Sequence, residues 1–448
     1  MRRDPSVPRE PLPPAARKAA FAGFVGTFIE YYDFALYGVL TVYFSPLFFP
    51  ADDPSTSLLT GLAVFGAGFV ARPVGGIIFG RIGDRHGRRH ALVASVLLMG
   101  LCSTLVALLP TYDSIGIAAP VLLVLLRLGQ GISAGSEMLG SITYVLESVP
   151  RSRRVFMASL TPMGALAGGT VSSVVAAILA GTLGGDAMTS YGWRIAFFLA
   201  APLAVFALLI RSRLEDSPEF TEIAAQREVV KTPLREIFRT HRRNLLIAGG
   251  IAMAANGAPN TAIWFHSYLV GERGIPGEQV FAASALMGLP IALLSPVAGR
   301  LCDRFGQRRV LAAVLCGYLV VSFPVLHFIS RADGVLQLIV VMGSFSLLGA
   351  LVQAPAFSYI AELFPARVRY TGANFGQNIG TVFGSGVAPF VAAVLVTATG
   401  STLGPGLWIV AVCLIAFVAL SFRAVHYVAG VDSADPASAE SQPAPDPV

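Results

Sequence analysis

Ionisable side chains lie inside several of the long apolar segments of this chain. Glu30 and Asp33 fall in the first segment, Arg72 in the second, and Arg127 and Glu137 in the fourth. At bilayer depth an ionised side chain costs at least about 2.5–3.5 kcal/mol, so it normally faces a bundle interior or a cavity. Acids and arginines that neutralise one another there can carry a proton or bind an anionic group, because an arginine fork holds a carboxylate through two bonds.

The second half of the chain offers neutral hydrogen-bonding side chains at comparable depth. Such groups can fix the orientation of a polar ligand, although a single Asn or Gln more often bonds a neighbouring helix. The candidate ligand contacts are Asn256, Asn260, Trp264, Gln353, Tyr359, Asn374, Gln377 and Asn378. The set as a whole therefore supports a polar ligand site more strongly than any one member does.

The composition shows what kind of elements must hold these groups. The chain is 54% hydrophobic and 13% charged, whereas soluble domains carry about 25% charged residues. Runs of roughly 20 mainly apolar residues are long enough to cross a bilayer as helices, and the short alternating segments of a membrane β-barrel are not seen. We expect an all-α membrane protein with twelve transmembrane helices over 19–46, 57–82, 89–110, 118–148, 155–181, 193–211, 244–270, 279–301, 309–330, 335–363, 371–398 and 404–428.

A long polar stretch at 212–243 separates six of these segments from the other six. We expect six-helix bundles over 19–211 and 244–428, joined by this stretch as a central loop. Residues 1–16 are rich in Pro and Arg and do not resemble a secretory signal. We expect a cytoplasmic arm over 1–18, and we expect this arm and the tail at 429–448 to be disordered.

The distribution of Lys and Arg predicts the orientation of the chain. With a cytoplasmic N-terminus, 27 of the 32 Lys and Arg residues fall on the cytoplasmic side and three on the opposite side. We therefore expect a multi-pass protein of the cell membrane with both termini in the cytoplasm. The formal net charge of +6 then belongs mostly to the cytoplasmic face and does not indicate nucleic-acid binding.

Sequence motifs for enzymatic chemistry are not found. The sequence contains no nucleotide-binding loop, metal-ligand spacing or nucleophile constellation. Its four cysteines are scattered in or beside apolar segments, as inert buried thiols usually are. We therefore expect neither an enzyme nor a cofactor or metal site.

An internal repeat relates the two halves. Asp84 and Asp303 lie 219 residues apart in matching charged contexts. Three more pairs are each 215 residues apart, namely Glu147 and Glu362, Pro150 and Pro365, and Arg154 and Arg369. The nearly constant spacing, 219 residues at the charged loops and 215 at the second motif, predicts a duplicated six-helix unit. Transporters built from such repeats hold their substrate near the membrane midplane, between the two repeats.

The two charged loops resemble a known family signature. The pattern G-x-x-x-D-R-x-G-R-R at 80–89, repeated in modified form at 299–309, is the hallmark of the major facilitator superfamily. The segment 26–34 is similar to the first-helix signature of the metabolite:proton symporters, which include bacterial carriers for shikimate, α-ketoglutarate, citrate and proline/betaine. The segments 71–76, 192–198 and 214–220 also resemble that family.

The chain departs from this family at two aromatic positions. Its fourth segment keeps the family's glutamate as Glu137 but has Met138 where an aromatic residue usually follows. Tyr31 stands where the family favours Trp. If those aromatic residues shape the binding site, the substrate of this chain differs from those of known members.

The resemblance implies roles for the buried charges. In such symporters a first-helix acid commonly faces a fourth-helix arginine, which implies that Asp33 couples protons and that Arg127 is its partner. Protonation of Asp33 would then free Arg127 for an anionic substrate. The alternative is a static interhelical ion pair. Glu30 could share the proton or brace its helix, and substrate-binding or structural roles remain open for Arg72 and Glu137.

The twin loops are expected to gate access. The family resemblance implies a cytoplasmic latch in which Asp84 accepts bonds from a helix N-terminus of the other bundle or pairs with a loop arginine. The candidate gating residues are Asp84, Arg85, Arg88, Asp303, Arg304 and Arg308. The alternative is that the arginines only orient the chain and contact anionic headgroups.

Together these features predict a secondary active transporter that takes up a small organic acid or related metabolite with protons by alternating access. A proton-coupled antiporter that exports drugs or metabolites is the alternative, but 161–169 lacks the Gly-Pro-centred block of such antiporters. The expected partners are a carboxylate or zwitterion, protons and the bilayer, and the chain is expected to act as a monomer.

Overall fold

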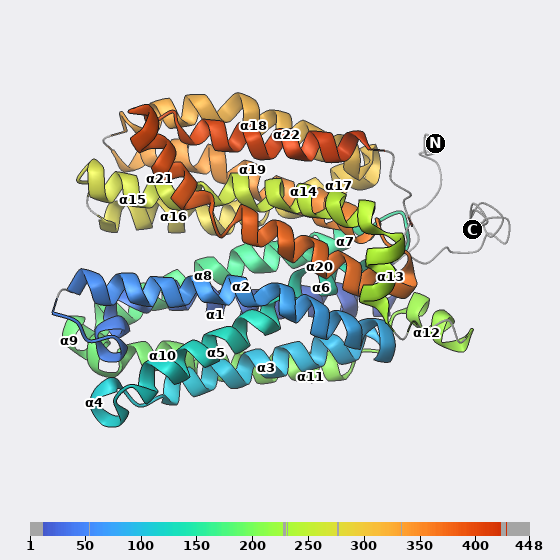
Figure 1. Cartoon of the computed structure of the whole chain (residues 1–448), viewed down its shortest axis with the longest axis horizontal. Coiled ribbons are helices and arrows are strands. Elements are labelled where there is room, and N and C mark those ends of the chain that lie inside the picture. The colour runs from blue at the N-terminus through green and yellow to red at the C-terminus, as the bar shows by residue number, and fades with distance from the viewer. Residues whose placement is uncertain are drawn as a thin grey trace.

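A computed structural model describes residues 12–52, 54–226, 230, 232–275, 277–332, 334–422 and 427. All regular secondary structure in these ranges is helical. Figure 1 shows two layers of roughly parallel helices, one built from the first half of the chain and one from the second. The expected tail and most of the expected arm lie outside the described residues, but Pro14 to Lys18 already belong to the first helix.

The helices of the first half are α1 Pro14–Phe48, α2 Pro54–His86, α3 Arg88–Leu108, α4 Tyr112–Ile115, α5 Ala118–Ala134, α6 Glu137–Ser148, α7 Arg154–Ala158, α8 Leu160–Leu183, α9 Gly185–Ala187, the π-helix η1 Met188–Gly192, α10 Trp193–Phe198 and α11 Ala200–Ser212. Short breaks divide several predicted membrane segments, such as the one between α5 and α6.

The central loop contains α12 Pro218–Ala225 and α13 Pro233–Thr240. The second half contains α14 Arg242–Asn260, α15 Ala262–Ser267, η2 Tyr268–Glu272, α16 Gly277–Ala292, α17 Ser295–Phe305, α18 Gln307–Ile329, α19 Val335–Ala361, α20 Ala366–Gly384, α21 Ala388–Thr399 and α22 Pro405–Ser421. When helices separated by short breaks are joined, each of the twelve predicted segments contains helix among the described residues, and the last segment, 404–428, is helical over Pro405–Ser421.

Two of the twelve segments are too polar to be recognised as membrane spans by hydropathy. Nine helical stretches among the described residues are long and apolar enough to cross a membrane, and Pro405–Ser421 is a shorter apolar helix. Those nine include neither α1 nor α14. Polar residues lower the hydropathy of both helices, because α1 carries Glu30 and Asp33 and α14 carries Asn256 and Asn260.

Glycines bring neighbouring helices of the first half into close contact. A Cβ atom on Gly131 of α5, or on Gly135 directly after this helix, would collide with a backbone carbonyl of α2, and one on Gly164 or Gly168 of α8 would collide with a carbonyl of α1. Both Gly-x-x-x-Gly spacings therefore lie at close helix crossings, as such spacings commonly do in membranes.

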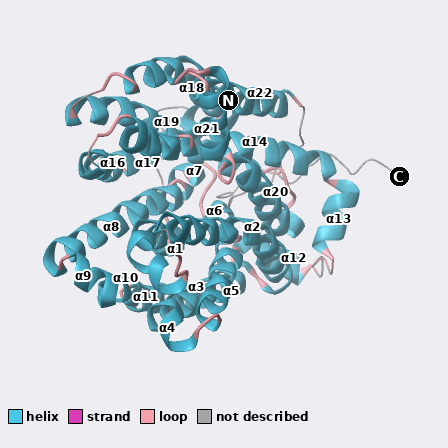
Figure 2. Ribbon diagram, turned by 60° about the vertical axis from the view of Figure 1, so that its left-hand side comes forward, coloured by secondary structure: helices cyan, strands magenta, loops and turns pink. Residues whose placement is uncertain are grey.

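The two layers meet along two seams. Helix α2 packs against α20 on one side, while α8 and α7 pack against α16 and α17 on the other. Figure 2, which turns the molecule by 60°, shows these helices lying side by side. The charged segments 81–89 and 300–309 cover the ends of α2 and α17 and the starts of α3 and α18. They lie at one end of these seams, which we call the twin-loop face.

Candidate functional site

The buried charges of the first half form one cluster between α1, α2 and α5. Glu30 and Asp33 of α1, Arg72 of α2 and Arg127 of α5 are all at most 5% exposed. Both arginines approach the ring of Phe34, with Cζ to centroid distances of 4.6 Å for Arg72 and 4.4 Å for Arg127. The negative face of an aromatic ring attracts a cation, and more strongly where water is excluded.

Arg127 keeps two guanidinium nitrogens without an acceptor. Its Nη1 donates to Gln130 Oε1 at 2.8 Å, and its Cζ lies 4.1 Å from the Tyr37 ring centroid and 5.4 Å from that of Phe65. Its Nε and Nη2 are buried and have no hydrogen-bond partner in the described structure. A buried arginine with unused N–H groups is suited to bind a carboxylate.

Asp33 does not pair directly with Arg127 in this structure. Instead Gln130 Nε2 donates to Asp33 Oδ2 at 2.6 Å and to Ser103 Oγ at 3.0 Å. The sequence-based hypothesis paired Asp33 with Arg127 directly and did not include the amide of Gln130, which lies between them. Gln130 lies three residues after Arg127, so both share one face of α5, and this spacing was the signal that could have revealed it.

Glu30 and Arg72 form a second acid–base pair beside the first. Arg72 Nη2 lies 3.5 Å from Glu30 Oε1. Glu30 Oε2 and Arg72 Nε have no hydrogen-bond partner among the described residues. The long distance and the unused atoms leave this pair free to change partners, so it remains a candidate for both proton and substrate contacts.

Glu137 is neutralised by Arg211, the last residue of the expected first bundle, near the end of α11. Arg211 of α11 is buried and donates to both carboxylate oxygens of Glu137, and also to Leu92 O at 2.9 Å. Ser95 Oγ adds a bond to Glu137 at 3.0 Å. Arg211 was one of the 27 cations counted on the cytoplasmic side, and it is buried between helices. The geometry favours the structural role for Glu137, which ties α6 to α3 and α11.

Most polar residues predicted on α14 and α20 bond within their own helix. Asn256 donates to Ala252 O at 2.7 Å, and Gln377 donates to Thr381 Oγ1 at 3.0 Å. Asn260 donates to Ser385 Oγ at 2.9 Å and so joins α14 to the segment after α20. These bonds are the structural roles that single amides commonly have in membrane helices.

Two amides of α20 lie at the seam with the first half. Asn378 donates to Gly135 O across the seam and to Asn374 O at 2.8 Å. Asn374 donates to Tyr370 O at 2.8 Å, and its Oδ1 is buried without a partner. A Cβ atom on Gly76 of α2 would lie 2.8 Å from Asn378 Nδ2, so α2 and α20 approach closely here.

The remaining three predicted contacts of the second half are dispersed. Trp264 is buried and stacks on Tyr268 with centroids 4.9 Å apart. Gln353 of α19 has a buried Oε1 without a partner. Tyr359 lines a cavity of about 740 Å³ at the twin-loop face together with Arg308. Tyr359 therefore lies beside the loops and not with the other predicted substrate contacts, because it is near the end of α19.

The two loop aspartates cap helices of the opposite half. Asp84 accepts backbone bonds from Tyr370 N at 3.2 Å and Thr371 N at 2.9 Å near the start of α20. Asp303 accepts bonds from Val155 N at 3.1 Å and Phe156 N at 2.9 Å in α7. The positive end of each helix stabilises the carboxylate. The twin-loop face is therefore closed by two reciprocal contacts.

Reciprocal ion pairs strengthen the same closure. Glu147 Oε1 lies 3.0 Å from Arg369 Nη1, and Arg154 Nε lies 2.9 Å from Glu362 Oε1. Each pair joins one half to the other. These four residues are the repeat landmarks found in the sequence, which had assigned them no role in closure.

The loop arginines are not equivalent. Arg88 is fully buried and donates to Asp84 at 2.9 Å, to Glu147 at 3.1 Å and to Ala366 O. Its counterpart after the second loop glycine is Gln307, so the second loop lacks a buried arginine. Arg85 is partly exposed, and Arg304 and Arg308 are exposed. These three side chains lie outside the buried contacts that close the seam.

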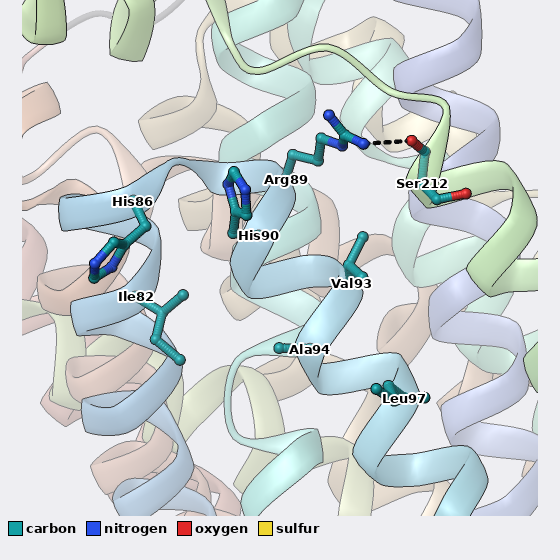
Figure 3. A pocket seen from close by; sticks show the side chains of 8 residues that line it. All are labelled: Ile82, His86, Arg89, His90, Val93, Ala94, Leu97 and Ser212. Carbon is teal, nitrogen blue, oxygen red and sulfur yellow. Dashed lines mark hydrogen bonds between the residues drawn. The ribbon is translucent and has the colours of Figure 1, made fainter.

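A shallow pocket near the first loop lies away from the charge cluster. It has a volume of about 570 Å³ and is lined by Ile82, His86, Arg89, His90, Val93, Ala94, Leu97 and Ser212. Figure 3 shows Arg89 reaching across it to Ser212, whose carbonyl oxygen accepts a bond at 2.6 Å. No predicted substrate or proton residue lines this pocket.

Comparisons with known proteins agree with this architecture. The sequence model of the Major Facilitator Superfamily matches residues 23–291 and again 245–445. The chain belongs to the major facilitator superfamily. It is therefore a multi-pass membrane transporter and not an enzyme.

Named relatives cover nearly the whole chain. It is 34% identical to the inner membrane metabolite transport protein YhjE of Escherichia coli (strain K12), over 90% of this chain and 93% of that protein. It is 30% identical to the proline/betaine transporter of the same organism, over 90% of this chain and 82% of that protein. These relatives agree with the resemblance to metabolite transporters stated above.

Solved structures of the superfamily share the fold at low sequence identity. The proton:xylose symporter XylE bound to 6-bromo-6-deoxy-D-glucose superposes with a TM-score of 0.74 at 17% identity, over 92% of this chain and 98% of that one. The inward open conformation of XylE from E. coli gives a TM-score of 0.62, over 90% of this chain and 95% of that one.

Proposed function

We propose that this transporter takes up a small organic acid or zwitterionic metabolite together with protons by alternating access. The observation that carries the proposal is Arg127, a buried guanidinium whose Nε and Nη2 have no acceptor among the described residues. A carboxylate of the substrate would supply that acceptor in a bidentate pair. Arg72, 4.6 Å from the shared Phe34 ring, would strengthen the attraction for an anion.

Asp33 is proposed as the proton carrier. It is fully buried on α1, and its Oδ1 has no partner in the described structure. The neighbouring Glu30 would share the proton or hold Arg72. Proton binding neutralises the cluster acids, so Arg127 and Arg72 become available to a carboxylate. Both ligands would then cross together, which is the requirement for symport.

The two bundles, 19–211 and 244–428, are proposed to rock about this cluster. We assign the twin-loop face to the cytoplasm, because the Lys and Arg bias supports that orientation. The contacts of Asp84 and Asp303 then hold a state closed to the cytoplasm. Opening inward would break both contacts and release substrate and proton, with the single chain acting as the transport unit in the cell membrane.

The names of the relatives support the substrate class but leave the compound open. One relative is named as a metabolite transport protein and another as a proline/betaine transporter. A test panel should therefore contain radiolabelled proline, glycine betaine, α-ketoglutarate, shikimate and citrate. It should be applied to purified protein in proteoliposomes.

Wild-type protein is expected to concentrate at least one panel compound when protons flow inward, and only to equilibrate it without a gradient. The Arg127→Gln variant is expected to lose this uptake. Equal uptake with and without the gradient would contradict proton symport. Accumulation driven by an acidic interior would instead indicate exchange.

A further inference from the structure

Gln130 forms hydrogen bonds with both Asp33 and Arg127 and so links these two side chains. It is fully buried on α5. Its Nε2 donates to Asp33 Oδ2 at 2.6 Å and to Ser103 Oγ at 3.0 Å, and its Oε1 accepts from Arg127 Nη1 at 2.8 Å. Both hydrogens of the amide nitrogen and its oxygen are therefore engaged.

Chemistry fixes the direction of this amide. An ionised carboxylate only accepts hydrogen bonds, and an arginine only donates them. The amide must therefore turn its nitrogen toward Asp33 and its oxygen toward Arg127 while Asp33 is charged. The opposite orientation would place N–H groups against a donor and an oxygen against an anion.

Protonation of Asp33 reverses this preference. The new O–H group must donate, and Asp33 Oδ1 has no hydrogen-bond partner in the described structure. A buried donor without an acceptor is costly. The amide oxygen of Gln130 becomes a suitable acceptor once the amide turns over. The turned amide then points its N–H groups toward Arg127, which cannot accept hydrogen bonds. Arg127 Nη1 therefore loses its acceptor, and all three guanidinium nitrogens become free to donate to another group.

We propose that Gln130 is the positioning residue that couples the two ligands, by turning its side-chain amide when Asp33 binds a proton and so releasing Arg127 to bind the substrate anion. This inference rests on the proposed symport and adds its molecular switch. One proton enters on Asp33 and leaves from it, and no covalent bond other than that O–H bond forms or breaks.

Other titratable and charged groups also face this switch. Glu30 lies on the same helix as Asp33, and Tyr37 of that helix contacts Arg127. Arg72 faces the cluster from α2, and Cys102 faces Asp33 from α3. Glu30 is already paired with Arg72. Because Gln130 forms hydrogen bonds with Asp33 and Arg127 and, within the described structure, not with these other groups, substitutions at Gln130 should change the coupling between Asp33 and Arg127 more than any other interaction in the cluster.

Two substitutions at Gln130 are expected to act in opposite directions. In Gln130→Leu nothing at this position holds Arg127, so affinity for the transported panel compound should stay high at all pH values. In Gln130→Glu a carboxylate holds Arg127 whether or not Asp33 is protonated, so affinity should fall at all pH values. Wild type should bind about tenfold more tightly at mildly acidic than at alkaline pH, the change expected for one charge-assisted hydrogen bond.

The measurement is binding of the panel compound against pH, with thermal unfolding of each variant. Gln226→Leu and Gln226→Glu, at an exposed position after α12, are matched controls expected to behave as wild type. A wild-type pH profile in Gln130→Leu would overturn the relay, as would equal loss of affinity in both Gln130 variants. A flat profile in wild type would instead contradict the proposed symport.

Infrared difference spectra between acidic and alkaline samples provide a readout without substrate. Wild type should show a carboxyl band that is absent in Asp33→Asn, accompanied by a side-chain amide band that is absent in Gln130→Leu. The Asp33 band should persist, shifted, in Gln130→Leu. A carboxyl band without any Gln130 component in wild type would overturn the relay even if no panel compound is transported.

Discussion

Glu147 and Arg369 form a 3.0 Å ion pair that joins the two halves of the molecule. The reciprocal pair, Arg154 with Glu362, has a distance of 2.9 Å. Because the internal repeat relates Glu147 to Glu362 and Arg154 to Arg369, one acid and one arginine per repeat produce two crossed pairs. The duplication of the sequence therefore supplies both sides of the closed twin-loop face.

The Asp84 contact is expected to control opening of this face. Asp84→Asn replaces a carboxylate that accepts two backbone bonds and one arginine bond. Losing hydrogen bonds to a charged group should weaken the closed state by about 1.5–3 kcal/mol. Initial uptake should fall, and cysteine probes on the opposite face should become less accessible. Unchanged uptake together with unchanged labelling would show that Asp84 is not a latch.

Cys302 provides a natural reporter for the second contact. It is buried beside Asp303 in the cavity at the twin-loop face. In protein whose Cys102, Cys316 and Cys413 are replaced by Ser, Asp303→Asn should increase labelling of Cys302 by a maleimide applied from that face. Asp186→Asn, near the opposite end of α8, is the control. Equal labelling of Asp303→Asn and the control would argue against a role in closure.

Charge reversal is expected to rescue one ion pair better than the other. Arg154→Glu and Glu362→Arg should each reduce uptake, and the double variant should recover most of it. The corresponding reversal at Glu147 and Arg369 should recover less, because an arginine at 147 would face the buried Arg88. Double-mutant cycles of initial uptake rates measure this difference. Equal recovery at both pairs would contradict the unequal roles of the two loops.

The Glu137 and Arg211 pair is expected to stabilise the fold and not to select the substrate. Arg211→Met alone leaves a buried carboxylate without its cation and should destabilise the protein by about 3–5 kcal/mol. Combining it with Glu137→Gln should restore much of the thermal stability and leave the preferred panel compound unchanged. A changed preference in the stable double variant would assign Glu137 to the substrate site.

Much of the architecture could be predicted from the sequence because the signals are large. Apolar length, the polar interruption at 212–243 and the repeated loops predict an all-α membrane protein with two related halves. The twin aspartates could be identified because a short charged motif is rare in such a chain. Burial of Arg211 could not be predicted, since its position at the end of α11 fits either a loop or a helix end.

The contacts within the charge cluster depend on geometry finer than a helix. Gln130 was not predicted, because burying a neutral amide costs less free energy than burying a charge. An amide in an apolar segment is therefore a weaker signal of function. Tyr359 was placed with the substrate residues because segment bounds do not give depth along a helix. The partners of Asp33 and Arg127 depend on side-chain rotamers, which neither hydropathy nor spacing determines.

The most direct test of the central claim measures proton movement with substrate in proteoliposomes that contain wild type or Asp33→Asn. Adding the transported panel compound outside wild-type vesicles should make the external medium more alkaline as protons enter with it. Asp33→Asn should abolish this alkalinisation while exchange of labelled for unlabelled compound continues. Persistent alkalinisation of wild-type size in Asp33→Asn would contradict the assignment of the coupled proton to Asp33.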